Sequence, residues 1–228
     1  SGTLSARGAG SGTGGLVETS GLQQLTLGEQ LSVSTDAPSG EFGTWLLDPI
    51  DLTVVASGGT ATIPGSVNEP TSATTINAST LVTALDSNND LRLEAPTVYL
   101  NAPISFMPGA NLSGTASTVY LGTNGTLLNG VSAVANDGTV NLAEATYSAS
   151  NVQIFRNVTL QGQGRDRTII QGDNTLRLFS ISAGTTTLDG LTLENGNDTT
   201  GNSAGGGAIR VSNSASLNLL NSLVQNNS

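Results

Sequence analysis

DGLTLENGN at residues 189–197 decides the fold, because NSLVQNN at residues 221–227 repeats its pattern. In both stretches alternating aliphatic residues precede an Asn-rich turn, the pattern of a short β-strand that ends in a tight turn. Further runs of this kind begin roughly every ten residues at residues 139–147, 151–155, 157–164, 168–172 and 178–182. The second half of the chain therefore predicts a series of short strands joined by Gly, Asn and Asp turns.

The first half carries the same pattern less regularly. Short strands are predicted within residues 17–21, 25–35, 44–56, 74–85, 90–106 and 118–130, and no helical periodicity of useful length is present. Pro64 and Pro70 would block ladder hydrogen bonds, so an irregular loop excursion is predicted at residues 56–75. A Gly-rich loop is predicted at residues 195–207, since its removal would bring residues 208–212 back into register with the preceding strands.

The composition distinguishes among the architectures that such tightly spaced strands can build. A sandwich or barrel should carry more than the 4% aromatic residues found here, whereas a solenoid requires repeated aliphatic residues that stack in register. The sequence therefore predicts an all-β fold, a parallel β-helix with loop excursions. Turn asparagines would form hydrogen-bonded ladders or simply adopt turn geometry, and both alternatives stay open for Asn151, Asn157, Asn195 and Asn221.

Charge and missing residue types exclude several functions. The net charge is −10 and all seven basic residues are arginines, which argues against nucleic acid as a partner. Without His or Cys the chain has no Ser-His-Asp triad, no thiol chemistry and none of the usual zinc ligands, so no cofactor is predicted. No apolar run approaches the roughly 20 residues that span a bilayer, so the chain is predicted not to span a membrane.

Carboxylates are the remaining candidates for chemistry. A glycosidase needs two of them on either side of one bond, and the regular second half offers four acids, namely Asp166, Asp173, Asp189 and Glu194. Their places at turns and strand ends favour solvated side chains, so no catalytic residue is predicted.

Asp86, Asn88 and Asp90 have the alternating oxygen ligands of a calcium loop. Leu91 stands where such a loop needs Gly, and Thr97 where it needs a bidentate Glu. An ordinary polar turn is therefore preferred, with these three residues as weak calcium candidates. The single tryptophan, Trp45, lies between apolar neighbours and is predicted to be buried rather than exposed for stacking on a sugar.

Two motifs resemble a known family. GG-x-VETSG at residues 14–21 and GTW-x-LDP-x-DLT at residues 43–53 resemble large exoproteins of the two-partner secretion type, related to filamentous haemagglutinins. The last hundred residues or so are similar to repeats of polymorphic outer-membrane proteins and to pectate-lyase-like folds. Residues 157–174 look like the opening coils of pectin-methylesterase-like proteins.

The resemblance implies a right-handed parallel β-helix, export across an outer membrane and adhesive or matrix roles. We expect haemagglutinin-like coils at residues 1–55, the excursion at 56–75, and a continuing β-helix at 76–228. The predicted function is an extracellular or cell-surface structural or adhesive module. Its expected partners are a polysaccharide or host surface, and end coils that stack into a filament. The alternative is a fragment of a polysaccharide-active enzyme.

Overall fold

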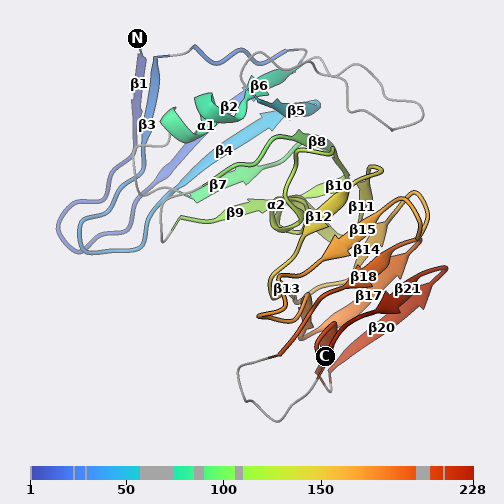
Figure 1. Ribbon diagram of the computed structural model, residues 1–228. Coiled ribbons are helices and arrows are strands. Elements are labelled where there is room, and N and C mark those ends of the chain that lie inside the picture. Colours follow the sequence, from blue (N-terminus) through green and yellow to red (C-terminus); the bar gives the residue numbers. More distant parts are fainter. Residues whose placement is uncertain are drawn as a thin grey trace.

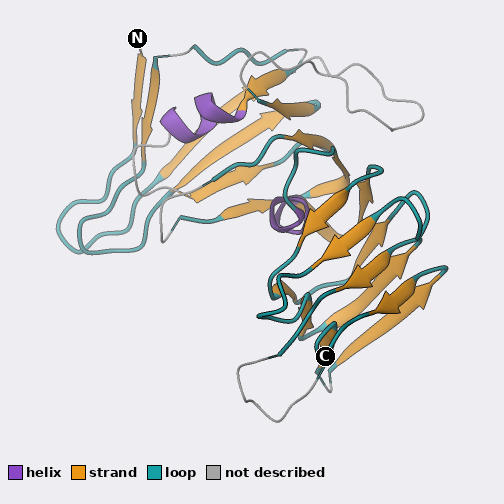
Figure 2. Cartoon of the chain, viewed as in Figure 1, coloured by secondary structure: helices purple, strands orange, loops and turns teal. Residues whose placement is uncertain are grey.

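All strand pairings in the described part of the protein are parallel. The computed structural model describes residues 2–22, 24–28, 30–56, 74–84, 90–105, 110–198, 206–212 and 214–228. The chain runs from β1 at one end of the molecule to β20 and β21 at the other (Figure 1). Figure 2 shows strands stacked on one another along this direction. The prediction of an all-β protein with parallel strands is confirmed.

The largest sheet has eight strands in the order β20-β17-β14-β11-β10-β8-β5-β6. Their bounds are β5 Leu52–Val55, β6 Thr75–Asn77, β8 Thr97–Asn101, β10 Ala116–Leu121, β11 Val134–Leu142, β14 Val158–Gln161, β17 Gly184–Asp189 and β20 Ala215–Leu220. Apart from β5 and β6 at one edge, neighbours in this sheet follow the order of the chain.

Smaller sheets are formed by the strands between these. One contains β12 Thr146–Ser148, β15 Ile169–Gln171, β18 Thr192–Glu194 and β21 Leu223–Gln225, and another contains β13 Val152–Ile154, β16 Phe179–Ile181 and β19 Ile209–Val211. Nearer the start of the chain, β2 Leu16–Gly21, β4 Thr44–Pro49, β7 Asp90–Leu93 and β9 Leu112–Gly114 form a third, and β1 Gly2–Ser5 pairs with β3 Leu31–Ser34. We call a run such as β14-β15-β16 a coil, because it pairs strand by strand with the next run, β17-β18-β19.

The core consists of aliphatic side chains that repeat in register from coil to coil. One column of fully buried residues crosses five strands of the large sheet: Val98, Val119, Val140, Leu160 and Leu188. Burial of each such side chain contributes about 1.5–3 kcal/mol before entropy is counted. A core of stacked aliphatic columns explains why the chain folds with so few aromatic residues.

The two family-like motifs of the first half occupy the same place in neighbouring coils. β2 and β4 pair in register, with Val17 opposite Trp45. Trp45 is fully buried, as predicted, and its Nε1 donates a hydrogen bond to Thr19 Oγ1 at 3.0 Å. Just before the two strands the backbones approach closely, and a Cβ on Gly43 would lie 2.7 Å from the carbonyl carbon of Gly14.

The sequence repeat between residues 189–197 and 221–227 also appears as strand pairing, because β18 and β21 are neighbours in one sheet. Thr192 lies opposite Leu223 and Glu194 opposite Gln225. The residues that follow these strands, Asn195 and Asn226, both adopt positive φ, at 59° and 52°. Asparagine tolerates this left-handed conformation better than most residues, so the turn repeats from coil to coil.

Three segments predicted as strands are not strands. α1 at Ala78–Ala84 and α2 at Leu127–Ala133 are helices, and residues 25–27 are irregular. α2 is favoured by an N-cap, since the Thr126 side chain accepts a hydrogen bond from the backbone N–H of Asn129. It also buries Leu127 and Val131, one helical turn apart. The strand prediction was wrong because the apolar residues of so short a run fit both the two-residue period of a strand and the 3.6-residue period of a helix.

The predicted loop excursions fall largely outside the described residues. Residues 57–73 of the first excursion and 199–205 of the second are not among the described residues. At the end of the first excursion, Thr75 is already in β6, which pairs with β5. After the second, β19 pairs with β16 in register, with Ile209 opposite Phe179.

Tyr147 in β12 offers a test of the core. Its hydroxyl donates to the carbonyl oxygen of Leu121 at 2.9 Å, and burial raises the pKa of the phenol well above its ordinary value. We expect Tyr147→Phe to cost about 1 kcal/mol at neutral pH, because the hydrogen bond is lost. Since the folded pKa is raised, this tyrosine's contribution is lost as pH rises above about 10. Urea unfolding at neutral and alkaline pH should show a shallower alkaline loss for the variant, and equal losses would contradict this assignment.

Candidate functional site

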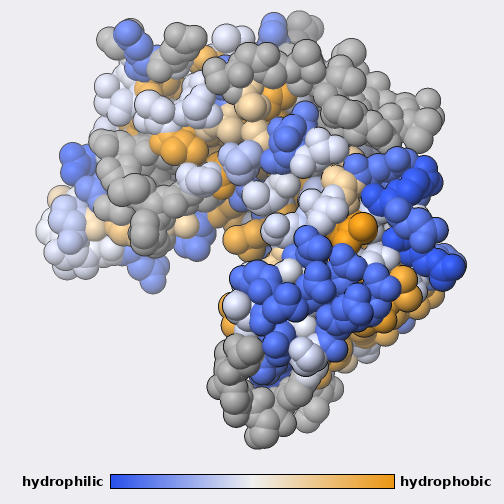
Figure 3. All heavy atoms as spheres, viewed as in Figure 1, coloured by the Kyte–Doolittle hydropathy of each residue, from blue (hydrophilic) through white to orange (hydrophobic). Residues whose placement is uncertain are grey.

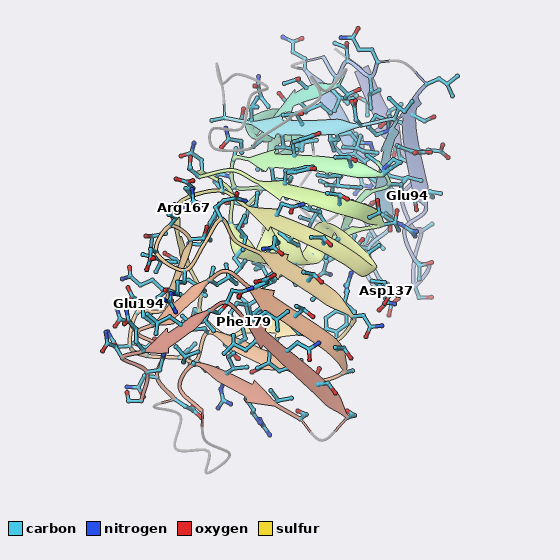
Figure 4. All side chains as sticks on the ribbon, turned by 90° about the vertical axis from the view of Figure 1, so that its right-hand side faces the viewer. Glu94, Asp137, Arg167, Phe179 and Glu194 are labelled. Atoms are coloured by element: carbon cyan, nitrogen blue, oxygen red, sulfur yellow. The ribbon has the colours of Figure 1, made fainter. Side chains whose placement is uncertain are left out.

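The four carboxylates singled out in the sequence do not converge on one site. Asp166 is exposed in a turn, and Asp189 Oδ1 accepts a hydrogen bond from Asn221 Nδ2 at 2.9 Å. Glu194 accepts hydrogen bonds from Gln171 and Gln225, its partners in the neighbouring strands, at 3.2 and 2.9 Å. Figure 4 shows Glu194 and Arg167 on one side of the ribbon and Asp137 and Glu94 on the other.

Asp173 has a perturbed acidity that local hydrogen bonds explain. It accepts from the Thr175 hydroxyl at 2.5 Å and from the Thr175 backbone N–H at 2.9 Å. Both bonds lower the pKa of the Asp173 carboxyl below its ordinary value, and the bond from the hydroxyl has the larger effect. A lowered pKa keeps the group ionised in a turn and does not make it a general acid.

The weak calcium candidates can be followed only in part. Asp86 and Asn88 lie outside the described residues, whereas Asp90 begins β7. Asp90 Oδ1 accepts hydrogen bonds from the backbone N–H and the side-chain amide of Asn111, at 2.9 and 3.2 Å. Within the described ranges no group of three or more acidic, His or Cys side chains could hold a metal ion.

The predicted asparagine roles divide between turns and ladders. Asn195 and Asn221 have positive φ, as expected of turn residues, and Asn221 also donates to Asp189 of the neighbouring coil. Asn157 forms a ladder across three coils: Nδ2 donates to Asp137 Oδ1 at 2.8 Å, and Oδ1 accepts from the Thr185 backbone N–H at 2.8 Å. Asn151 does both, with positive φ and a side-chain oxygen that accepts from the Ser180 hydroxyl at 2.6 Å.

The outer face of the large sheet carries a row of hydroxyl side chains. Register places them side by side on successive strands, at Thr97, Thr118, Thr139, Thr159 and Thr187, and Asn218 continues the row. Neighbouring strands lie about 4.8 Å apart, so the row is evenly spaced. It is a long, uncharged polar surface.

A polar groove lies over the sheet of β13, β16 and β19. Its cavity volume is about 250 Å³. Strand register places Gln153, Ser180 and Arg210 side by side across the three strands. These outward positions alternate with the buried Val152, Ile154, Phe179 and Ile181. The remaining lining residues are Asn151, Leu176, Arg177, Ser182, Asp198 and Ser212.

A buried ion pair forms one wall of this groove. Arg177 Nη2 pairs with Asp198 Oδ2, and the two side chains are only 8% and 7% exposed. Nη1 of Arg177 is buried and has no hydrogen-bond partner among the described residues. Removing either member would leave a buried charge without a partner, which would destabilise this wall of the groove.

Sequence reasoning did not find this groove. Its residues come from three coils and lie far apart in the sequence, between Asn151 and Ser212. The usable signal was the outward residue at the centre of each short apolar run, Gln153, Ser180 and Arg210. Arg165 and Arg167, the nearest pair of basic residues in the sequence, are exposed in a turn outside the groove.

The fold and the groove define a class: an all-β protein of stacked parallel sheets, with a polar groove on one sheet and a hydroxyl row on another. No protein-family model, curated protein or solved structure matches the chain. Among the helices of the described residues, none has the length and apolar character needed to cross a bilayer.

Proposed function

We propose that the chain is an extracellular structural or adhesive module, folded as a right-handed parallel β-helix. Strand-by-strand pairing of consecutive coils supports the β-helix, because each coil repeats the sheets of the one before. The handedness follows the rule for parallel crossovers, which are right-handed in nearly all proteins. Location outside the cell rests on the resemblance of residues 14–21 and 43–53 to secreted exoproteins.

One observation carries the non-catalytic function: the outer polar side chains bond from coil to coil. Glu194 is held between two glutamines and Asp189 accepts from Asn221, so these carboxylates stabilise stacking. The polar groove over β13, β16 and β19 is lined by one acid, Asp198, which is paired with Arg177, so the groove does not supply the two carboxylates that hydrolysis of a sugar linkage needs. The hydroxyl row and the groove remain as surfaces for binding.

A binding experiment that also follows the fate of the polysaccharide tests this function. The purified chain should be retained on immobilised polysaccharide or on host-cell surfaces and should leave the polymer length unchanged after prolonged incubation. Cleavage that is abolished by Asp166→Asn or Asp189→Asn would instead establish the enzyme alternative. Failure to bind any such surface would contradict the adhesive function.

The edge formed by β20 and β21 favours a second candidate function, end-to-end association. Leu219 and Val224 continue the core columns of Leu188 and Leu193, yet they are 41% and 43% exposed where those two are fully buried. Figure 3 shows hydrophobic atoms along this end of the molecule, beside a hydrophilic face. Such a strand edge pairs readily with another strand, and head-to-tail contacts that do not close give a filament.

Charged substitutions at this edge should abolish such association. We expect light scattering of the purified chain to show mass that rises with concentration, and Leu219→Asp with Val224→Asp to hold it at the monomer mass. Leu22→Asp is the matched control, since Leu22 is exposed elsewhere. A monomer mass at every concentration for the unaltered chain would contradict filament formation.

A further inference from the structure

We propose that the groove over β13, β16 and β19 binds an anionic saccharide, with the exposed Arg210 pairing with the carboxylate or sulfate of the sugar and Arg177 adding positive charge to the groove wall. This inference rests on the proposed adhesive function and names the ligand class of one of its surfaces. The groove is about 250 Å³ in volume, slightly below the range of drug-sized ligand sites. It therefore suits one segment of a sugar chain.

Arg177 supplies a donor that the described residues leave unused. Its Nη2 is paired with Asp198, while its buried Nη1 has no partner among them. A guanidinium has five N–H donors, and a buried donor without an acceptor is unfavourable. Nη1 is closed off from solvent, so Arg177, which lines the groove, favours an anion there through its positive charge rather than through a direct hydrogen bond.

Arg210 adds an exposed positive charge at the same place. It projects from β19 beside Ser180, and no salt bridge joins it to a described acid. The lining contains two arginines and one aspartate, a net charge of +1 in a chain whose net charge is −10. Arginine binds carboxylate and sulfate-like groups with two parallel hydrogen bonds, so this local excess favours an anion.

The rest of the lining is suited to sugar hydroxyl groups. Asn151, Gln153, Ser180, Ser182 and Ser212 offer amides and hydroxyls that both donate and accept hydrogen bonds.

An apolar surface lies beside these groups. Phe155 is 61% exposed and follows Ile154, which pairs with Ile181, so it lies next to Ser182. The Arg156 guanidinium lies over this ring, 5.0 Å from its centroid, so the opposite ring face is the one that could pack against the C–H face of a sugar ring at the edge of the groove.

Calorimetry on the whole chain with three tetrasaccharides tests the proposal. The probes are a hyaluronan fragment with carboxylates, a heparin fragment with sulfates, and neutral chitotetraose. We expect at least one anionic probe to bind about tenfold more tightly than chitotetraose, and tighter binding of the heparin fragment would show that its sulfates add to the carboxylates that both fragments carry. Arg210→Gln should weaken that binding about fivefold, an amount typical of one lost exposed charge pair.

Arg165→Gln is the matched control, since it removes the same charge from an exposed turn outside the groove. It should change affinity less than twofold, and circular dichroism should show that both variants keep the fold. Equal binding of chitotetraose, or equal effects of the two variants, would overturn the anionic site while leaving adhesion through another surface intact. Absence of binding to all three probes would also overturn it, and the surface-retention experiment separately decides whether adhesion itself fails.

Discussion

Replacing Trp45 with alanine is expected to lower the free energy of unfolding by about 3–5 kcal/mol. Trp45 is fully buried in β4, between β2 and β7, where it lies opposite Val17 and Leu91. The substitution leaves a large cavity between stacked coils and leaves Thr19 Oγ1 without the indole donor. Urea denaturation followed by circular dichroism measures the loss.

Two further variants serve as comparisons for Trp45→Ala. Trp45→Phe keeps most of the volume and loses the hydrogen bond, so it should cost clearly less than alanine. Leu22→Ala removes an exposed side chain and should change stability by less than about 0.5 kcal/mol. If Trp45→Ala were as mild as Leu22→Ala, the tryptophan would not be in the core.

Alanine at Gly43 is expected to cause a comparably large loss, through backbone contact rather than a cavity. A Cβ there would meet the Gly15 carbonyl oxygen and lie 2.7 Å from both the Gly15 nitrogen and the Gly14 carbonyl carbon. Backbone atoms cannot rotate away, so β2 and β4 would have to separate and lose hydrogen bonds such as Thr44 N–H to Gly15 C=O, 3.0 Å. We expect a loss of more than about 2 kcal/mol.

Gly28→Ala is the control for this prediction. A Cβ at Gly28 would meet nothing within 4 Å, so the same chemical change is made in open space. Its stability should stay within about 0.5 kcal/mol of the unaltered chain, or rise slightly because alanine restricts the unfolded state. Equal effects of the two substitutions would show that the coils around Gly43 are not closely stacked.

Much of the fold could be predicted from the sequence because its core repeats. Alternation of apolar and polar residues marks the strands, and the echo of residues 189–197 at 221–227 corresponds to an actual register. Helices α1 and α2 could not be predicted, since seven residues with four apolar positions, alanines included, fit a strand as well as a helix. For α2 the hydrogen bond from the Asn129 backbone to Thr126 decides the outcome, and it forms only once the chain turns there.

The candidate site was less accessible to sequence reasoning. Burial of Trp45 was predicted correctly from its apolar neighbours, and the carboxylates were correctly placed at turns and strand ends. The groove depends on stacking, which brings Gln153, Ser180 and Arg210 together from strands 27 and 30 residues apart in register. The lengths of the loops between coils set that register, and the alternation of apolar and polar residues alone does not determine it.

An engineered disulfide between neighbouring coils tests most directly whether the coils stack parallel and in register, on which both binding surfaces depend. Thr159→Cys with Thr187→Cys places two cysteines directly opposite on β14 and β17, in a chain without other cysteines. Their Cα atoms should lie about 4.8 Å apart, within the range that a disulfide spans. We predict rapid oxidation of this pair and little for Thr159→Cys with Asp189→Cys, which is offset by two residues. Preferential oxidation of the offset pair, or of neither, would contradict the stacked arrangement.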